Sequence, residues 1–146
     1  MQHFIINSAY RGGKLQEELF YKYGSDYALP SGHSEHQTGL SIDIGSIEGT
    51  MDNVAEGKWL ENNAAQYGFI LRYPADKVDI TGIDYEPWHF RYVGLPHSIV
   101  MQDKNFVLEE YLAYIKKEKA FKAKVHGVHY VIQYSENEPT TTIPKS

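Results

Sequence analysis

Two histidines and an aspartate in this chain have the chemistry of metal ligands. The string SEHQTGLSID, residues 34–43, places His36 seven positions before Asp43, and His89 follows in YEPWHFRY. Two imidazole nitrogens and one carboxylate oxygen suit zinc, and three protein ligands leave a fourth position for a water molecule. We therefore take His36, Asp43 and His89 as candidate ligands of a catalytic zinc ion (Zn2+).

A carboxylate stands close to this set in the sequence. Glu86 precedes His89 by three residues. A carboxylate that lies beside a metal without ligating it can accept a proton from the attacking water and pass it on, so Glu86 is the candidate general base. Taken alone, each spacing is weak evidence, because short motifs of this kind recur in unrelated structural contexts.

Two predicted strands would present Asp43 and His89. The string LSIDIG, residues 40–45, alternates apolar with polar or small residues, so its apolar side chains would be buried and Asp43 would point to the opposite face. The string WHFRYVG, residues 88–94, alternates in the same way and places His89 opposite Trp88, which we expect to be buried beneath the sheet.

Helices and loops are predicted around these strands. Apolar spacing and capping residues predict helices over 14–23, ending at Gly24; over 52–67, capped by Asp52 or Asn53 and ending at Gly68; and over 105–120, capped by Asn105. FILRYP, residues 69–74, reads as a strand, and residues 75–87 as a loop or hairpin-like excursion. The mixture predicts an α+β fold in which a small antiparallel sheet carries the zinc site and helices flank it.

The last part of the chain lies outside this arrangement. Residues 121–134 read as two short strands around a His-Gly turn, and residues 135–146 as a disordered polar tail. We therefore divide the chain into a catalytic domain, residues 1–120, and a short extension, residues 121–146.

Composition narrows the classes of function. The chain has 146 residues, a length typical of one domain, and a net charge of -5, which argues against a nucleic-acid surface built on diffuse basicity. It has no cysteine, so a transition-metal site must use His, Asp and Glu. We find no transmembrane-length apolar run and no secretory leader, so the chain as written is expected in the cytoplasm, or at the cell envelope if the native N-terminus is longer.

Three separated motifs together resemble a known family. SEHQTGLSID is similar to the signature S-x-H-x-x-G-x-A-x-D, and EPWHFRYVG to E-x-W-H-x-R-Y. SAYR, followed by Gln16, resembles S-G-Y-R…Q. These are motifs of the zinc D-alanyl-D-alanine carboxypeptidases and dipeptidases of the VanY and VanX type, and they occur here in the family's order. Ser41 replaces the signature alanine, and Ala9 replaces a glycine.

The resemblance implies a role for each matching residue. It makes His36, Asp43 and His89 the zinc ligands and Glu86 the catalytic base. It places Arg11 near the scissile peptide or the substrate carboxylate, where a guanidinium can donate two parallel hydrogen bonds. Ser34 and Gln16 match positions that would help to hold the terminal D-alanine.

The implied activity is removal of C-terminal D-alanine from peptidoglycan precursors or stem peptides that end in D-Ala-D-Ala, with the free dipeptide as a further substrate. A related alternative is an L,D-carboxypeptidase or a peptidoglycan endopeptidase. A non-catalytic zinc-binding module is a third interpretation, which Glu86 disfavours because a structural site has no need of a base.

Overall fold

The computed structural model describes residues 3–25, 28–136 and 141–145. The first half contains strands β1 (Phe4–Ser8) and β2 (Ser41–Ser46), helices α1 (Gly13–Tyr23) and α2 (Ala55–Asn63), and strand β3 (Phe69–Leu71). The second half contains α3 (Val78–Thr81), β4 (His89–Tyr92), α4 (His97–Lys104), α5 (Leu108–Glu118), β5 (Ala120–Val125), β6 (Val128–Gln133) and β7 (Thr141–Lys145).

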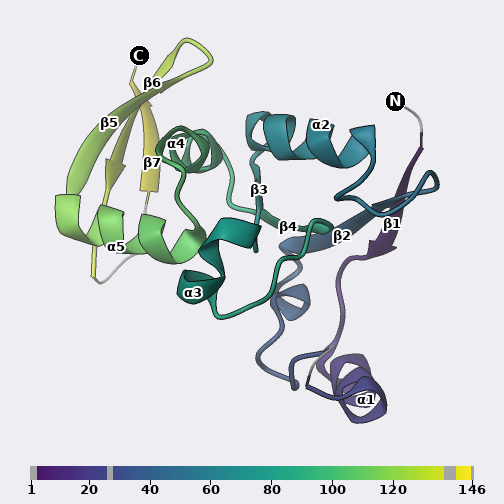
Figure 1. Ribbon diagram of the computed structural model, residues 1–146. Helices are drawn as coiled ribbons and strands as arrows, with labels where there is room; N and C mark the ends of the chain where they lie inside the picture. The colour runs from purple at the N-terminus through teal and green to yellow at the C-terminus, as the bar shows by residue number, and fades with distance from the viewer. Residues whose placement is uncertain (1–2, 26–27, 137–140, 146) are drawn as a thin grey trace.

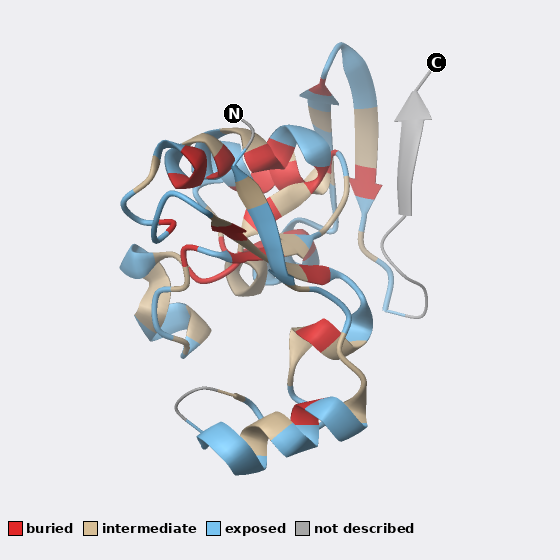
Figure 2. Cartoon of the chain, turned by 90° about the vertical axis from the view of Figure 1, so that its right-hand side faces the viewer, coloured by how far each residue is buried: buried red, intermediate tan, exposed pale blue. Residues whose placement is uncertain are grey.

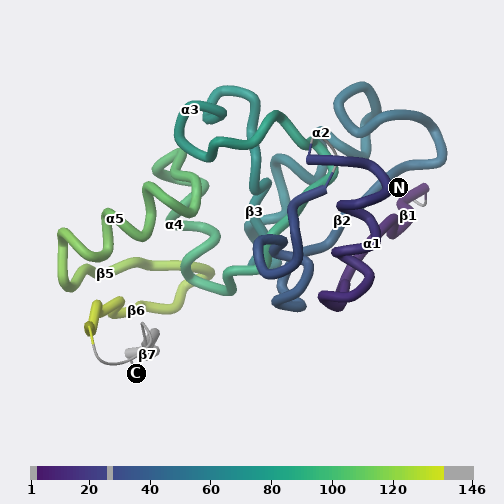
Figure 3. Tube along the Cα trace, turned by 90° about the horizontal axis from the view of Figure 1, so that it is seen from below, coloured from purple at the N-terminus to yellow at the C-terminus, as the bar shows by residue number. Residues whose placement is uncertain are grey.

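The first sheet is antiparallel and has the strand order β1-β2-β4-β3. Helix α2 lies on one side of it and α1 on the other (Figure 1). The second sheet has the strand order β5-β6-β7. Its strands β5 and β6 lie beside α4 and α5 at the far end of the molecule from α1 (Figure 1), as Figure 3 also shows from below. The predicted α+β fold with a small antiparallel sheet is confirmed.

The side of the first sheet that faces α2 is apolar. Ile42 and Ile44 of β2 pack against Leu60, Ala64 and Phe90, the last of which is only 1% exposed. Burying a side chain of this size stabilises the fold by about 1.5–3 kcal/mol. Because side chains alternate along a strand, this packing turns Asp43 to the opposite side, as the period-2 pattern predicts. The predicted burial of Leu40 is wrong, because this residue precedes β2 and is 40% exposed.

A second core lies between α4, α5 and the β5–β6 hairpin. Ile70, Met101, Tyr111, Ile115 and Ile132 are all buried in it, and Figure 2 shows the buried residues gathered in the body of the molecule while α1 is largely exposed. The predicted hairpin around the His-Gly turn is confirmed. The division at residue 120 stays a prediction.

The tail prediction is wrong for residues 141–145, which form β7 along the edge of β6; residues 137–140 and 146 lie outside the described residues. A free strand edge can pair with any segment of β-forming residues, and TTIPK supplies threonines and an isoleucine. Its proline is compatible with an edge strand.

The predicted C-terminal ends of the helices agree with the structure better than the predicted N-terminal caps. Gly24 and Gly68 have φ values of 81° and 86° and end α1 and the 3-10 turn after α2, as predicted. Helix α2 begins at Ala55, so a cap at Asp52 or Asn53 is wrong. Asn105, with φ 52°, is the C-terminal cap of α4, a helix that the sequence reading missed.

Two further local predictions need correction. The side chain of Glu110 accepts the backbone N–H of Val107 at 3.0 Å, so α5 begins after Val107 and not after Asn105. The excursion over 75–87 holds a 3-10 turn and the one-turn helix α3 in place of a hairpin. None of the described helices is long and apolar enough to cross a membrane.

Candidate metal centre

Adjacent strands and one short turn bring three candidate ligands together. Asp43 of β2 pairs with His89 of β4 in the antiparallel register, and His36 lies on the 3-10 turn Glu35–Thr38 that precedes β2. One ligand atom from each of the three lies within 4.8 Å of the other two. His36 and His89 are 4% and 6% exposed, so the cluster is largely shielded from solvent.

Hydrogen bonding fixes which nitrogen of His36 faces the cluster. Its Nδ1 lies 2.7 Å from the carbonyl oxygen of Ala9, which can only accept, so Nδ1 carries the proton. Its Nε2 then lies 3.2 Å from Oδ2 of Asp43. Nδ1 of His89 lies 3.2 Å from Oδ1 of the same carboxylate.

The buried polar atoms of this cluster are not all satisfied. Within the described part of the chain, Oδ1 of Asp43 and Nε2 of His89 are buried without a hydrogen-bond partner. A buried carboxylate oxygen without a donor is costly, whereas a cation held between it and two imidazole nitrogens would satisfy it. The donor set and its unsatisfied oxygen therefore fit a zinc ion.

The electrostatics of the cluster also favour a cation. Burial would raise the pKa of Asp43, but the two histidines outweigh it and hold that pKa at about 2. Burial would lower the pKa of His89, but the neighbouring carboxylates of Asp43, Glu35 and Glu86 raise it to about 9. The site thus attracts positive charge, here a proton, strongly enough to reverse the effect of burial.

Glu86 lies beside the cluster on the loop before β4. Its Oε2 is 3.4 Å from Nδ1 of His89, and its backbone N–H donates to the carbonyl of Tyr73 at 3.0 Å. Burial, assisted by the charge of Asp43, raises the pKa of Glu86 despite the opposing effect of His89. A carboxylate with a raised pKa, close to a metal cluster, has the properties of a general base.

Arg11 enters the site from the segment before α1. Its guanidinium donates to Oε1 of Gln16 at 2.9 Å and to Oγ of Ser8 at 2.8 Å, and lies 3.9 Å from Oδ2 of Asp43. Gln16 is 1% exposed and donates in turn to the carbonyl of Leu29. These bonds hold the guanidinium in one place at the edge of the cluster.

All seven predicted site residues line one cleft of about 390 Å³. They are Arg11, Gln16, Ser34, His36, Asp43, Glu86 and His89. Trp88 also lines the cleft and is 40% exposed, so the expectation that it is buried beneath the sheet is wrong. It immediately precedes β4, where the strand alternation does not yet apply.

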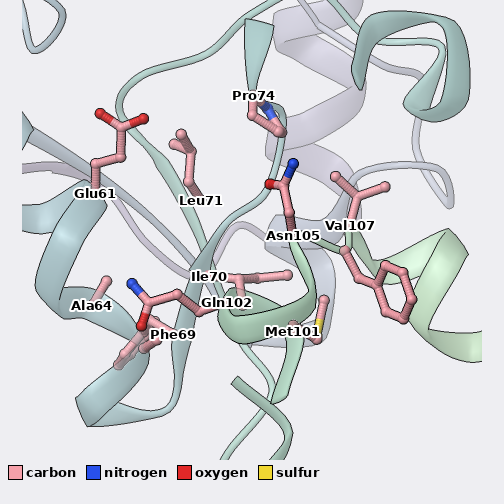
Figure 4. Close-up of a pocket in the computed structure, with 12 residues that line it drawn as sticks. Glu61, Ala64, Phe69, Ile70, Leu71, Pro74, Met101, Gln102, Asn105 and Val107 are labelled. Atoms are coloured by element: carbon pink, nitrogen blue, oxygen red, sulfur yellow. The ribbon is translucent and has the colours of Figure 1, made fainter. Parts of the chain in front are cut away.

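A second cavity, of about 140 Å³, lies between β3 and α4 (Figure 4). Its lining is mostly apolar, and its polar members are Glu61, Gln102 and Asn105. The one group of three or more metal-binding side chains found among the described residues is the cluster in the first cleft. The first cleft is therefore the candidate functional site.

Sequence reasoning missed several residues that shape the site. Glu35 and Arg72 form an ion pair behind His89, and the buried ring of Tyr73 lies 5.0 Å from the imidazole of His89. Arg91, which the sequence left outside the predicted catalytic set, contacts Glu35 at 3.1 Å. Glu35 lies inside the SEHQTGLSID motif, but only the fold shows what it contacts.

The family model described as VanY, D-alanyl-D-alanine carboxypeptidase, matches residues 2–95. The chain is 56% identical, over 98% of its length, to a D-alanyl-D-alanine carboxypeptidase of Enterococcus faecium. It covers 47% of that relative, so it spans about half the length of this curated protein.

The chain resembles solved structures of peptidases that are named for different activities. The D,D-dipeptidase VanXYg, in complex with a D-Ala-D-Ala phosphinate analogue, is 35% identical with TM-score 0.81, covering 99% of this chain and 65% of that one. The LD-carboxypeptidase LdcB is 41% identical with TM-score 0.70, covering 76% and 58%. A variant of the D,D-pentapeptidase VanY from a VanB-type cassette, in complex with Zn(II), is 38% identical with TM-score 0.65, covering 75% and 71%.

The family model accounts for well over half of the chain, and its matched region contains every member of the His-Asp-His cluster together with Glu86 and Arg11. The chain belongs to the VanY family of D-alanyl-D-alanine carboxypeptidases.

Proposed function

We propose that this chain is a zinc peptidase that removes the C-terminal D-alanine from peptidoglycan precursors or stem peptides ending in D-Ala-D-Ala. The observation that carries the proposal is the convergence of His36, Asp43 and His89 within 4.8 Å, beside the carboxylate of Glu86. The carboxypeptidase relative and the VanY structure with Zn(II) support it.

In this proposal His36, Asp43 and His89 hold the zinc ion, which would lower the pKa of a water molecule and polarise the scissile carbonyl. His36 offers Nε2, because its Nδ1 proton is engaged by Ala9. The antiparallel pairing of β2 with β4 sets the spacing of Asp43 and His89, so two of the three ligands sit on rigid strands.

Glu86 would move the proton in two directions. Its carboxylate accepts a proton from the attacking water as the oxygen–carbon bond forms, and then donates it to the nitrogen of the departing D-alanine as the carbon–nitrogen bond breaks. Its raised pKa suits the first step, because a stronger base accepts the proton more readily.

Arg11 would stabilise the negative charge that develops on the carbonyl oxygen, or bind the C-terminal carboxylate of the substrate. Its bonds to Gln16 and Ser8 fix it before substrate arrives, so little reorganisation is needed. Ser34, which lines the same cleft, would help to hold the terminal D-alanine together with Gln16.

The LD-carboxypeptidase LdcB favours a second candidate, removal of D-alanine from a tetrapeptide stem. The deciding experiment measures D-alanine released from D-Ala-D-Ala, a muramyl pentapeptide and a muramyl tetrapeptide, each with stoichiometric zinc and after chelation. Zinc-dependent release from the pentapeptide supports the proposal, and release from the dipeptide as well indicates dual activity.

Release from the tetrapeptide alone would assign the L,D activity in its place. A chain that binds zinc but releases no D-alanine from any of the three would contradict both. In that case the remaining interpretations would be a peptidoglycan endopeptidase and a non-catalytic zinc-binding module.

A further inference from the structure

Glu35 lines the same cleft as the candidate metal ligands and is surrounded by donors. Its Oε1 accepts from Nε of Arg72 at 2.8 Å and lies 3.1 Å from a guanidinium nitrogen of Arg91. Its Oε2 accepts from the hydroxyl of Ser41 at 3.1 Å and lies 3.6 Å from Nε2 of His89. The side chain of Glu35 is 16% exposed, so these contacts are largely shielded from water.

The geometry of His89 requires an acceptor on this side. Its Nδ1 faces Asp43, so a ring that coordinates through Nδ1 must carry its proton on Nε2. Nε2 is buried, and Glu35 supplies the carboxylate nearest to it at 3.6 Å. Histidine ligands of metals commonly donate their second N–H to such an acceptor, which fixes the ring and raises its basicity.

We propose that Glu35 is a positioning residue for the metal centre, held by Arg72 and Glu109 so that it accepts the Nε2 proton of His89 and orients the ring. This inference rests on the proposed zinc site. It gives helix α5, which lies beyond the residues matched by the family model, a part in assembling that site.

The link to α5 runs through one buried guanidinium. Arg72 is 7% exposed, and its two terminal nitrogens donate to the carboxylate of Glu109 at 3.0 and 2.6 Å. Its backbone N–H also donates to the carbonyl of His89 at 3.0 Å. Arg72 therefore connects Glu109 to Glu35 with all three of its guanidinium nitrogens engaged, next to the strand that carries the metal ligand.

The charge of Glu35 is balanced by two neighbouring guanidinium groups. Arg72 pairs with its Oε1 at 2.8 Å, and Arg91 lies 3.1 Å from the same oxygen. Its other oxygen, Oε2, is therefore the one that faces His89.

The competing interpretation is an ion-pair network that only joins α5 to the sheet. Such a network would affect folding stability and leave metal binding alone. Zinc affinity and the spectrum of a bound cobalt ion separate the two, because both report the ligand set directly.

The first test replaces Glu35 with Gln, which keeps the volume and removes the charge. We expect the zinc dissociation constant, measured against a chromophoric chelator, to rise by about 10–100-fold, the usual effect of losing such a partner. We also expect the visible absorption bands of the Co(II)-loaded protein to shift. A dissociation constant within about twofold of the unaltered protein, with an unchanged cobalt spectrum, would overturn the proposal.

The second test keeps the inference falsifiable if Glu35→Gln does not fold. Glu109→Gln breaks the link one residue further away and should weaken zinc binding several-fold. Glu110→Gln is the matched control, because Glu110 is the next residue on α5, pairs with Lys77 at 3.0 Å and is not bonded to Arg72. Equal zinc affinity in these two variants would overturn the link through Arg72.

The zinc dissociation constant and the cobalt spectrum are measured without substrate. They therefore test the role of Glu35 independently of the proposed peptidase activity. A chain that binds zinc and loses affinity on Glu35→Gln, yet releases no D-alanine, would support the positioning role and contradict only the activity. A chain that binds no zinc would overturn both.

Discussion

Two histidines in different parts of the molecule have pKa values shifted in opposite directions. His89 is 6% exposed in the cleft, facing Asp43, Glu35 and Glu86, and its pKa is raised to about 9. His97, half-buried at the start of α4, has its Nδ1 2.7 Å from the hydroxyl of Tyr111, and burial lowers its pKa. The residue type is the same, and the surroundings decide its charge.

The difference shows what separates a metal cluster from a packed core. Burial by itself disfavours a charged imidazole, as at His97. At His89 the nearby carboxylates of Asp43, Glu35 and Glu86 outweigh burial and raise the pKa. The cleft side of the first sheet is therefore built for a charge, and the α4–α5 core is built for packing.

The largest expected effect separates the two histidines directly. His89→Ala should abolish zinc binding and activity together, because affinity depends on the complete ligand set. His97→Ala should leave the zinc content unchanged and lower only the melting temperature, since it removes packing near Tyr111. Metal analysis and D-alanine release on both variants check this, and zinc lost from His97→Ala would erase the contrast.

The next effect tests the acid beside the ligands. Glu86→Gln should lower kcat by about 10²–10⁴-fold, the usual contribution of a general base, while zinc stays bound. Metal content and single-turnover rates, measured on one preparation, distinguish a slower chemical step from a loss of zinc. Substantial turnover in this variant would remove Glu86 from the proposed mechanism.

A smaller effect is expected from the cation at the edge of the cleft. Arg11→Ala should reduce kcat/KM by about 10²–10³-fold, because it removes a fixed donor to the developing negative charge, and should leave zinc bound. Lys14→Ala is the matched control, because Lys14 is an exposed cation three residues further on. An equal decrease in kcat/KM in the two variants would mean that the position of Arg11 is unimportant and that only the total positive charge near the cleft affects the rate.

The smallest effect concerns pH and the core histidine. Since the folded-state pKa of His97 is lowered, the unfolded chain binds the proton more tightly, and stability from this residue is complete above about pH 6.5 and falls as the pH drops below it. His97→Gln should therefore show a shallower loss of unfolding free energy between pH 7 and 5. Urea unfolding at several pH values measures the unfolding free energy of both proteins. If the two plots of free energy against pH are parallel, His97 does not contribute to the pH dependence.

Local sequence patterns predicted much of the fold. Alternation in LSIDIG predicted that Ile42 and Ile44 face the core and Asp43 faces away, because a strand of period 2 leaves little choice once one face is apolar. Glycines predicted where α1 and the turn after α2 end. Helix starts were harder, since Val54 and Val107 precede α2 and α5 where polar caps were expected.

The parts that failed depend on distant partners. Helix α4 is short and weakly amphipathic, and the second core around Met101 stabilises it. Strand β7 exists because β6 offers an edge. Trp88 stands at the rim of the cleft, which the alternation of its neighbours does not reveal.

The sequence by itself predicted which residues would carry the chemistry: the motifs named His36, Asp43, His89, Glu86 and Arg11, and the structure places all of them along one cleft. Only the tertiary structure decided how these side chains are held. Glu35 meets His89 from one direction and Arg72 from another, and Glu109 reaches Arg72 across 37 residues. A residue type limits the chemistry that a side chain can perform, but a hydrogen-bond partner far along the chain is set by packing, which no local pattern records.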